Sequence, residues 1–310
     1  LAKRFERRGI LGNPEMLHTS VFYSNKMFIF GGYGSSKRND LWEIDLSAMT
    51  PTWSNTISHG AIGSPSARTT HNMVLYGSKI ILYGGQSTND LWEMDLAASS
   101  PAWSVVIVDG ATGSPPVVEL RAATLRGTNL VIFGGRTNSI VYNNDLWKID
   151  LSAATPTWSN IIPQGAAGSP SKRYCLPSVS YDARVFIFSG NVLDEGLTND
   201  LWEIDLSDAT PTWSNTITKD GADIIPPHRY CLHHGILYGT KMVIFSGAND
   251  RNDLWSLDLS ALCNIPTSGS ATITSDCTLF SQFIVTGKLN VTGIPDAQGN
   301  LPKIIGGGSN

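Results

Sequence analysis

Asn-Asp-Leu-Trp stands at residues 39–42 and returns at residues 89–92, 144–147, 199–202 and 252–255. The steps between copies are 50, 55, 55 and 53 residues. A small pair precedes each copy, as Gly31-Gly32, Gly84-Gly85, Gly134-Gly135, Ser189-Gly190 and Ser246-Gly247. Asp-Leu follows each copy, and four copies continue to Pro-x-Trp-Ser, with the tryptophans at Trp53, Trp103, Trp158 and Trp213. Five copies in one order indicate an internal repeat, which is the strongest single signal of architecture in a sequence.

The second repeat shows how one unit folds. Residues 68–76 and 79–83 are rich in β-forming residues, and Gly77 between them predicts a tight hairpin turn. The pair Gly84-Gly85 lets the backbone leave the second strand where a Cβ would crowd. Asn89 and Asp90 are expected to close the next turn through side-chain to backbone hydrogen bonds.

The third strand of this unit is expected at residues 91–96, and Trp103 opens a fourth strand. Trp92 and Met94 alternate with Glu93 and Asp95, so the two faces of the third strand differ and large apolar groups can pack between neighbouring sheets. Each repeat therefore predicts four short strands, named A to D below in chain order.

Paired glycines and a following tryptophan at this period resemble the kelch repeat, whose units form four-stranded blades around a central channel. The resemblance covers roughly residues 9–260. It implies an all-β, five-bladed kelch-type β-propeller with four-stranded blades. Kelch propellers serve many functions, so the fold by itself names none.

We expect a propeller over residues 1–262 and a β-rich C-terminal extension, or the start of another domain, over residues 263–310. The fifth repeat lacks Pro-x-Trp-Ser, so residues 3–8 are expected to supply its fourth strand; a fragment of a larger propeller is the alternative. The tail has strand-like runs at residues 271–273 and 283–291. It resembles the first coil of a parallel β-helix, and a flexible linker is the alternative.

Composition argues against two classes of partner. The 310 residues carry 22 Lys and Arg against 26 Asp and Glu, a formal net charge of −4. This balance gives no general attraction to nucleic acid. No apolar run approaches the roughly 20 residues that span a bilayer, so no membrane insertion is expected. The absence of an initiator Met suggests a processed or excerpted chain.

The loops between strands B and C vary from repeat to repeat, whereas the turns between strands C and D are nearly constant. Variable loops on a fixed scaffold are where binding residues usually lie. The predicted partner-binding residues are Lys37, Arg38, Arg136, Tyr142, Asp194, Glu195, Asp250 and Arg251. The alternative is that these residues are solvated loop tips.

Four arginines stand near the start of strand A in successive repeats: Arg68, Arg121, Arg173 and Arg229. Guanidinium groups bind carboxylate and phosphate groups with two parallel hydrogen bonds, so the arginines are also predicted to bind a partner. In propellers of this kind an arginine at this place is equally a structural tether.

Catalytic and metal sites are not predicted. His18, His71 and His233 share one position of strand A, but no carboxylate recurs beside them, and channel-lining groups bridged by water are the favoured interpretation. A galactose-oxidase-like copper site and sialidase boxes are both missing. No phosphate-binding loop is found either. We therefore expect no enzyme activity and no cofactor.

The four cysteines favour an oxidising compartment. Cys175 and Cys231 both lie in Arg-Tyr-Cys-Leu on adjacent blades and can pair, while Cys263 and Cys277 would close a short loop. Asn290 begins an N-glycosylation sequon. These signals predict a secreted or cell-surface protein, with a cytoplasmic one as the alternative.

The prediction for function is a non-catalytic protein-interaction or structural scaffold, part of a larger extracellular or cell-surface protein. It would meet its protein partner on the face that carries the B–C and D–A loops. The alternative is a glycan-binding module in which Tyr33 and Tyr142 stack on sugars, and an enzyme resembling galactose oxidase is the least favoured.

Overall fold

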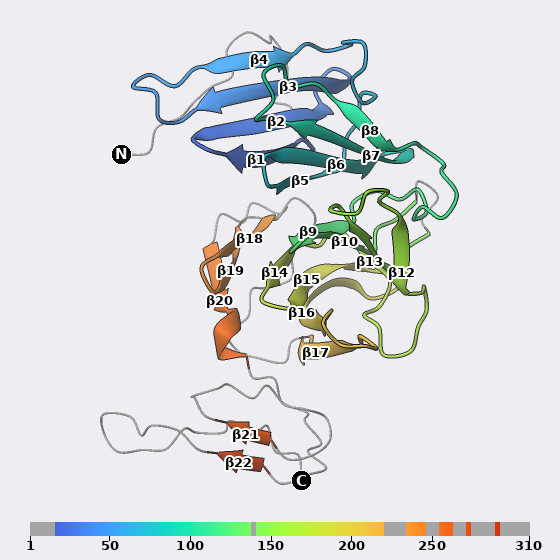
Figure 1. Cartoon of the computed structure of the whole chain (residues 1–310). Coiled ribbons are helices and arrows are strands. Elements are labelled where there is room, and N and C mark those ends of the chain that lie inside the picture. Colours follow the sequence, from blue (N-terminus) through green and yellow to red (C-terminus); the bar gives the residue numbers. More distant parts are fainter. Residues whose placement is uncertain are drawn as a thin grey trace. The chain divides into compact units, whose positions relative to one another are not determined.

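The structure is a computed structural model that describes residues 16–137, 141–219, 234–245, 254–262, 271–273 and 289–291. Across these ranges the regular structure is β-strand, apart from one 3-10 turn, η1 (Leu259–Ala261). The strands form antiparallel sheets in chain order, one for each repeat (Figure 1). The predicted all-β, five-bladed propeller is confirmed.

The first three blades each contain four described strands, paired A-B-C-D. Their bounds are β1 (Thr19–Tyr23), β2 (Lys26–Tyr33), β3 (Lys37–Asp45) and β4 (Trp53–Ile57); β5 (Asn72–Tyr76), β6 (Lys79–Gly85), β7 (Thr88–Asp95) and β8 (Ser104–Ile107); and β9 (Ala122–Arg126), β10 (Asn129–Phe133), β11 (Leu146–Asp150) and β12 (Trp158–Ile162).

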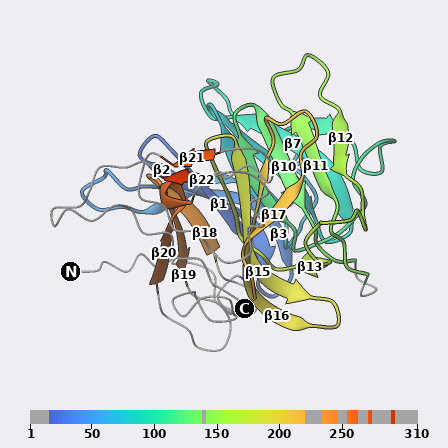
Figure 2. The same cartoon turned by 90° about the horizontal axis from the view of Figure 1, so that it is seen from below.

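The fourth blade divides its A strand into two segments that both pair with its B strand. Its strands are β13 (Arg173–Tyr174), β14 (Ser178–Tyr181), β15 (Arg184–Val192), β16 (Gly196–Asp205) and β17 (Trp213–Ile217). The fifth blade shows β18 (His234–Tyr238), β19 (Lys241–Phe245) and β20 (Leu254–Asp258), which lie side by side in Figures 1 and 2. The chain divides into two compact units, Leu1–Leu176 with Asn191–Asp194, and Pro177–Gly190 with Glu195–Asn310.

The first residue of the repeated tetrapeptide fastens the next D–A loop. Asn89 donates from Nδ2 to the carbonyl of Pro115 at 2.7 Å and accepts from the backbone N–H of Gly110 at 2.8 Å. The same two bonds recur at Asn39 and Asn144. The expectation that Asn89 and Asp90 form a turn was wrong, because β7 already begins at Thr88. Their side chains instead bond to loops on either side of the strand.

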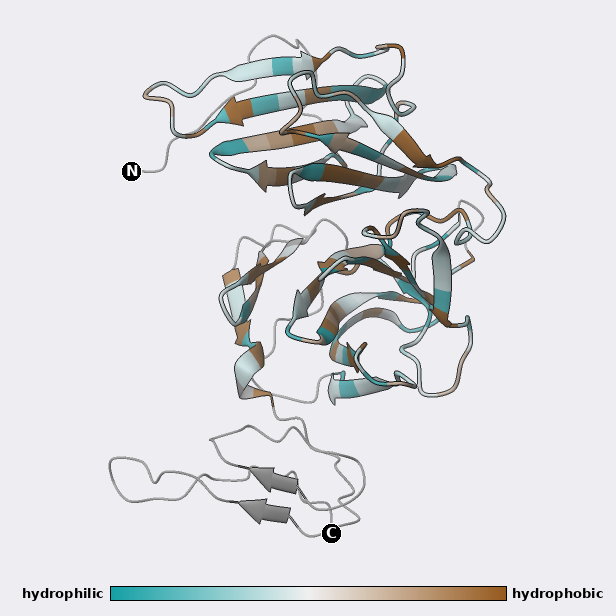
Figure 3. Cartoon of the chain, in the orientation of Figure 1, coloured by the Kyte–Doolittle hydropathy of each residue, from teal (hydrophilic) through white to brown (hydrophobic). Residues whose placement is uncertain are grey.

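The remaining residues of the tetrapeptide act within the blade. The indole N–H of Trp92 donates to Asp90 Oδ2 at 2.7 Å, and Trp42, Trp147 and Trp202 make the equivalent bond in their own repeats. The leucine of the tetrapeptide is fully buried in the first four blades. It joins apolar cores such as the one formed by Phe30, Leu82 and Trp103. Burying a large apolar side chain contributes about 1.5–3 kcal/mol, and Figure 3 shows hydrophobic segments within the strands of both units.

The paired glycines of the first and third blades meet the backbone of the next blade and form a joint there. A Cβ on Gly134, which has φ +68°, would lie 2.7 Å from the carbonyl oxygen of Arg173 in the next blade. A Cβ on Gly135 would lie 2.8 Å from the carbonyl oxygen of Glu119 in its own blade. The amide of Gly135 donates to the Arg173 carbonyl at 2.8 Å. Side chains are thus excluded here because two backbones meet. In the second repeat, where the sequence predicted crowding, a Cβ on Gly85 would lie 2.9 Å from the carbonyl oxygen of Thr69, whereas one on Gly84 would keep 3.4 Å from that of Thr88.

Two expectations concern the ends of the chain. Residues 3–8, expected to complete the fifth blade, lie outside the described residues. In the tail, β21 (Ala271–Ile273) and β22 (Leu289–Val291) pair in parallel, within the two runs expected to be strands. Within the described ranges, no helix has the length and apolar character to cross a membrane.

Candidate functional site

The B–C connections lie at the same end of their blades and present most of the predicted contact residues. In the first blade Lys37 opens β3 and pairs with Tyr33 across the turn. The guanidinium of Arg38 lies 3.5 Å from Asp40 Oδ2 and its side chain is 26% exposed. Tyr33 is 43% exposed. Two cationic side chains and one accessible ring therefore lie beside one short turn.

The third blade and the first strand of the fourth present a set of four residues that we call the Arg136 cluster: Glu119, Arg136, Tyr142 and Tyr174. Arg136 bridges to both Glu119 and Tyr142 through backbone pairing. Its Nε donates to Glu119 Oε1 at 3.3 Å, and its Cζ lies 4.5 Å from the centre of the Tyr174 ring. Tyr142 meets the same ring edge-on at 4.9 Å. The guanidinium is thus held by a carboxylate and an aromatic face, and the Arg136 side chain is still 34% exposed.

The other predicted loop residues contribute less. Asp194 and Glu195 form an exposed turn between β15 and β16, and Asp194 has φ +67°. Asp250 and Arg251 lie outside the described residues. The structure therefore brings Arg136 and Tyr142 together and leaves the partner-binding role of the whole set as a prediction.

Arg68 has the geometry of the structural tether. Its side chain is 1% exposed and forms a two-pronged ion pair with Asp90, at 2.6 and 2.8 Å. It also donates to the carbonyl of Gly84 and to the hydroxyls of Thr88 and Ser66. Burial acts to raise the pKa of Asp90, but hydrogen bonds and charge from Arg68 outweigh burial, and the pKa lies below its usual value. The hydrogen bonds of the Arg68 guanidinium are thus made within its own blade, as expected for a structural tether.

The other arginines differ among themselves. Arg173 is 2% exposed and donates from Nε to the carbonyl of Ser171, as Arg68 does to Ser66. Arg121 is also buried, but it lies 5.7 Å from the ring centre of Tyr83 and bonds to the carbonyl of Pro116. Arg229 lies outside the described residues.

The third blade lacks the tether. Val118 packs against the second glycine of its pair, the place that Arg68 takes in the second blade. The carboxylate that would receive an arginine there belongs to Asp145, whose buried Oδ1 has no partner among the described residues. The sequence shows this exchange of arginine for valine, but it does not show that Asp145 Oδ1 is left without a partner among the described residues.

His71 is buried and neutral. Burial lowers its pKa to about 3, and the positive charge of Arg68 acts in the same direction. Neither ring nitrogen has a hydrogen-bond partner in the part of the chain that the structure describes. The ring packs edge-on against Phe30 at 5.5 Å. His233 lies outside the described residues, and within them no group of three His, Cys, Asp or Glu side chains could hold a metal ion.

Cys175 is buried directly after β13. The pairings of Cys175 with Cys231 and of Cys263 with Cys277 remain predictions, because the last three lie outside the described residues. Asn290 belongs to β22, and its glycosylation remains a prediction.

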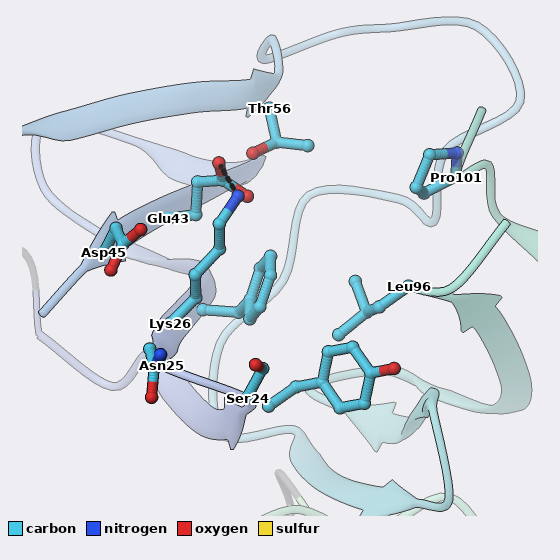
Figure 4. A pocket seen from close by; sticks show the side chains of 10 residues that line it. Ser24, Asn25, Lys26, Glu43, Asp45, Thr56, Leu96 and Pro101 are labelled. Carbon is cyan, nitrogen blue, oxygen red and sulfur yellow. Dashed lines mark hydrogen bonds and ion pairs between the residues drawn. The ribbon is translucent and has the colours of Figure 1, made fainter. Parts of the chain in front are cut away.

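A pocket of about 280 Å³ lies at the opposite end of the blades from the B–C loops, and sequence reasoning missed it (Figure 4). It is formed by the A–B turn and neighbouring strand residues of the first blade, together with the C–D turn of the second. Its lining residues are Tyr23, Ser24, Asn25, Lys26, Phe28, Glu43, Asp45, Thr56, Leu96 and Pro101. The near-constant C–D turns gave no signal of it, because the pocket forms between two repeats.

Two known proteins resemble this chain in sequence. The chain is 32% identical to human host cell factor 2 over 82 residues, 24% of this chain and 10% of that protein. It is 27% identical to the Drosophila melanogaster leucine-zipper-like transcriptional regulator 1 homolog over 253 residues, 77% of this chain and 25% of that protein. The chain thus spans a quarter or less of the length of these relatives.

A solved structure and a family model cover more of the chain. The structure of YjhT superposes with a TM-score of 0.59 at 14% identity, over 78% of this chain and 80% of that one, which supports the fold. The family model described as the KLHDC2/KLHL20/DRC7 Kelch-repeats domain matches residues 2–117 and 89–293. The chain belongs to this Kelch-repeats family.

Proposed function

We propose that the chain is a non-catalytic protein-interaction scaffold that binds its partner through the B–C loop face, with the Arg136 cluster as the anchor. The observation that carries the proposal is the guanidinium of Arg136, held between Glu119 and Tyr174 and still accessible. Membership of a Kelch-repeats family supports the scaffold role.

The physical argument is preorganisation. Arginine and tyrosine are enriched among the residues that dominate interface energies. Ordering a long side chain on binding costs about 0.5–1.5 kcal/mol. Contacts from Glu119 and Tyr174 have already restricted Arg136 in the unbound chain, so less of this cost remains. Arg136 and Tyr142 therefore present a cationic and an aromatic group in fixed positions.

The test compares variants on opposite ends of the blades. The wild-type chain is immobilised, a partner is captured from an extract of the source organism and identified, and its purified form is titrated against Arg136→Ala, Tyr142→Ala and the control Lys79→Ala. An anchor residue contributes about 2 kcal/mol or more, so Arg136→Ala should weaken binding about 30-fold. Equal affinities for Arg136→Ala and Lys79→Ala would overturn the proposal.

We also propose that the chain folds in the secretory route or at the cell surface. The even number of cysteines and the sequon at Asn290 support this, because disulfides persist mainly in oxidising compartments and N-glycosylation occurs on secreted proteins. Intact mass of protein from its native source, alkylated with and without reduction and with and without glycosidase, tests it. Two disulfides or a glycan on Asn290 would agree with the proposal, and four alkylated thiols without a glycan would refute it.

A further inference from the structure

We propose that the pocket between the first and second blades binds a sugar ring. The pocket lies at the far end of the blades from the B–C loops, so this inference goes beyond the protein-interaction role and does not depend on it. It rests on the arrangement of polar and apolar groups across the cavity.

One side of the pocket is polar. Lys26 and Glu43 form an ion pair there, and Figure 4 shows them facing the cavity opposite Leu96 and Pro101. Thr56 and Ser24 add hydroxyl groups at the edges of the cavity. Leu96 and Pro101 of the second blade give the opposite side an apolar surface, and Tyr23 and Phe28 also belong to the lining.

The ion pair in this pocket has a single close contact. Lys26 Nζ donates to Glu43 Oε1 at 2.9 Å, and among the described residues no hydrogen bond joins Lys26 to Glu43 Oε2. An ammonium group has three donors, so this contact leaves a donor of Lys26 and an acceptor of Glu43 unused. Two neighbouring hydroxyl groups on a ring match that arrangement, since one can accept from Lys26 while the other donates to Glu43.

The second blade contains a matched pair that lacks these features. Lys79 Nζ contacts both oxygens of Glu93, at 3.1 and 3.0 Å, so both carboxylate oxygens are engaged. Neither residue lines the pocket. The two ion pairs occupy equivalent positions on their B and C strands, so the pair in the second blade serves as an internal control.

Other ligand classes fit the pocket less well. A purely apolar side chain would remove water from the unused donor and acceptor without replacing their hydrogen bonds, which is costly. A charged ligand would compete with the existing ion pair. A neutral ring with an apolar face and hydroxyl edges satisfies both sides, and the cavity volume of about 280 Å³ is near the small end of ligand sites.

The test uses saturation-transfer NMR and titration of the full chain with the methyl pyranosides of glucose, galactose, mannose and N-acetylglucosamine. We expect at least one to bind, with affinity reduced at least 10-fold in Glu43→Gln and unchanged in Glu93→Gln. Exposed ion pairs contribute little to stability, so both variants should fold, and equal urea midpoints check this.

Three results would overturn the inference. No pyranoside binds at millimolar concentration, or Glu93→Gln weakens binding as much as Glu43→Gln does. A third is that a protein partner, and no sugar, loses affinity in Glu43→Gln, which would assign the pocket to a protein side chain. The B–C loop proposal is tested by Arg136 variants, so the two can fail separately.

Discussion

The repeated Asn-Asp-Leu-Trp places an aspartate in the same position of each blade, yet its removal should have very different costs in neighbouring blades. In the second blade Asp90 accepts from both terminal nitrogens of Arg68, from the hydroxyl of Thr88 and from the indole of Trp92. In Asp90→Asn one oxygen becomes an NH₂ group that faces two donors. The variant also leaves the Arg68 charge buried without its counter-charge.

Removing one partner of a buried ion pair costs about 3–5 kcal/mol. In the third blade Asp145 accepts from the indole of Trp147 through Oδ2, and its Oδ1 has no partner among the described residues. Asp145→Asn can keep the Trp147 bond and place NH₂ where Oδ1 was, so its cost should stay below about 1 kcal/mol. The matched pair thus predicts a difference of at least ~2 kcal/mol.

Urea unfolding followed by tryptophan fluorescence measures this difference. With a slope of about 3 kcal/mol per molar urea, Asp90→Asn should unfold at roughly 1 M lower urea than wild type, and Asp145→Asn close to wild type. The pKa of Asp90 is lowered in the folded chain. Its contribution is therefore present at neutral pH and is lost as the pH falls through that lowered pKa. Equal midpoints for the two variants at pH 7 would refute the tether argument.

Three further substitutions test other contacts by urea unfolding. The folded pKa of about 3 for His71 lies below its unfolded value, so stability falls by about 1.4 kcal/mol per pH unit as the pH drops from 6 to 4. His71→Leu replaces the titrating ring with an apolar side chain and should reduce that slope; an unchanged slope would contradict the buried neutral ring. Asn144→Ala removes two bonds to the next D–A loop and should cost about 2 kcal/mol; a cost under a few tenths would show that the loop is held otherwise. In Gly134→Ala the new Cβ meets a backbone carbonyl, so the variant should lose about 2 kcal/mol of stability. The control Gly127→Ala, whose Cβ meets open space at a similar φ, should lose less; equal losses would contradict the close approach of two backbones at Gly134.

The sequence allowed the blade to be predicted because each residue of the repeat has a local task. Leucine of the tetrapeptide is buried in the first four blades, and Gly77 takes φ +61° in the expected hairpin turn. Such features depend on neighbours within one repeat, so the period reveals them. The error at Asn89 and Asp90 had the same origin, since turn chemistry was assigned to residues whose bonds reach 20 residues or more along the chain.

The site residues were predicted less completely because they depend on contacts between repeats. Arg136 and Tyr142 were chosen as loop residues, but Tyr174, which packs against both, comes from the next repeat. Glu119 could have been noticed as the acidic residue where the second repeat has Thr69, since both lie against the second glycine of their pairs. The pocket gave no such sign, because Lys26 and Leu96 belong to different blades.

The residues that hold the third blade together and those proposed to bind a partner are different residues of the same B–C connection. The side chain of Asn144 bonds to the D–A loop, and the side chain of Leu146 is buried in the core. The contacts that hold the third blade therefore come from β11 and the residues just before it. Arg136 and Tyr142 lie beyond the paired glycines, where their contacts are to Glu119 and Tyr174. Replacing Arg136 or Tyr142 therefore leaves the blade's own hydrogen bonds intact. Loss of binding without loss of stability in those variants would be the expected signature of an interaction surface on a kelch scaffold.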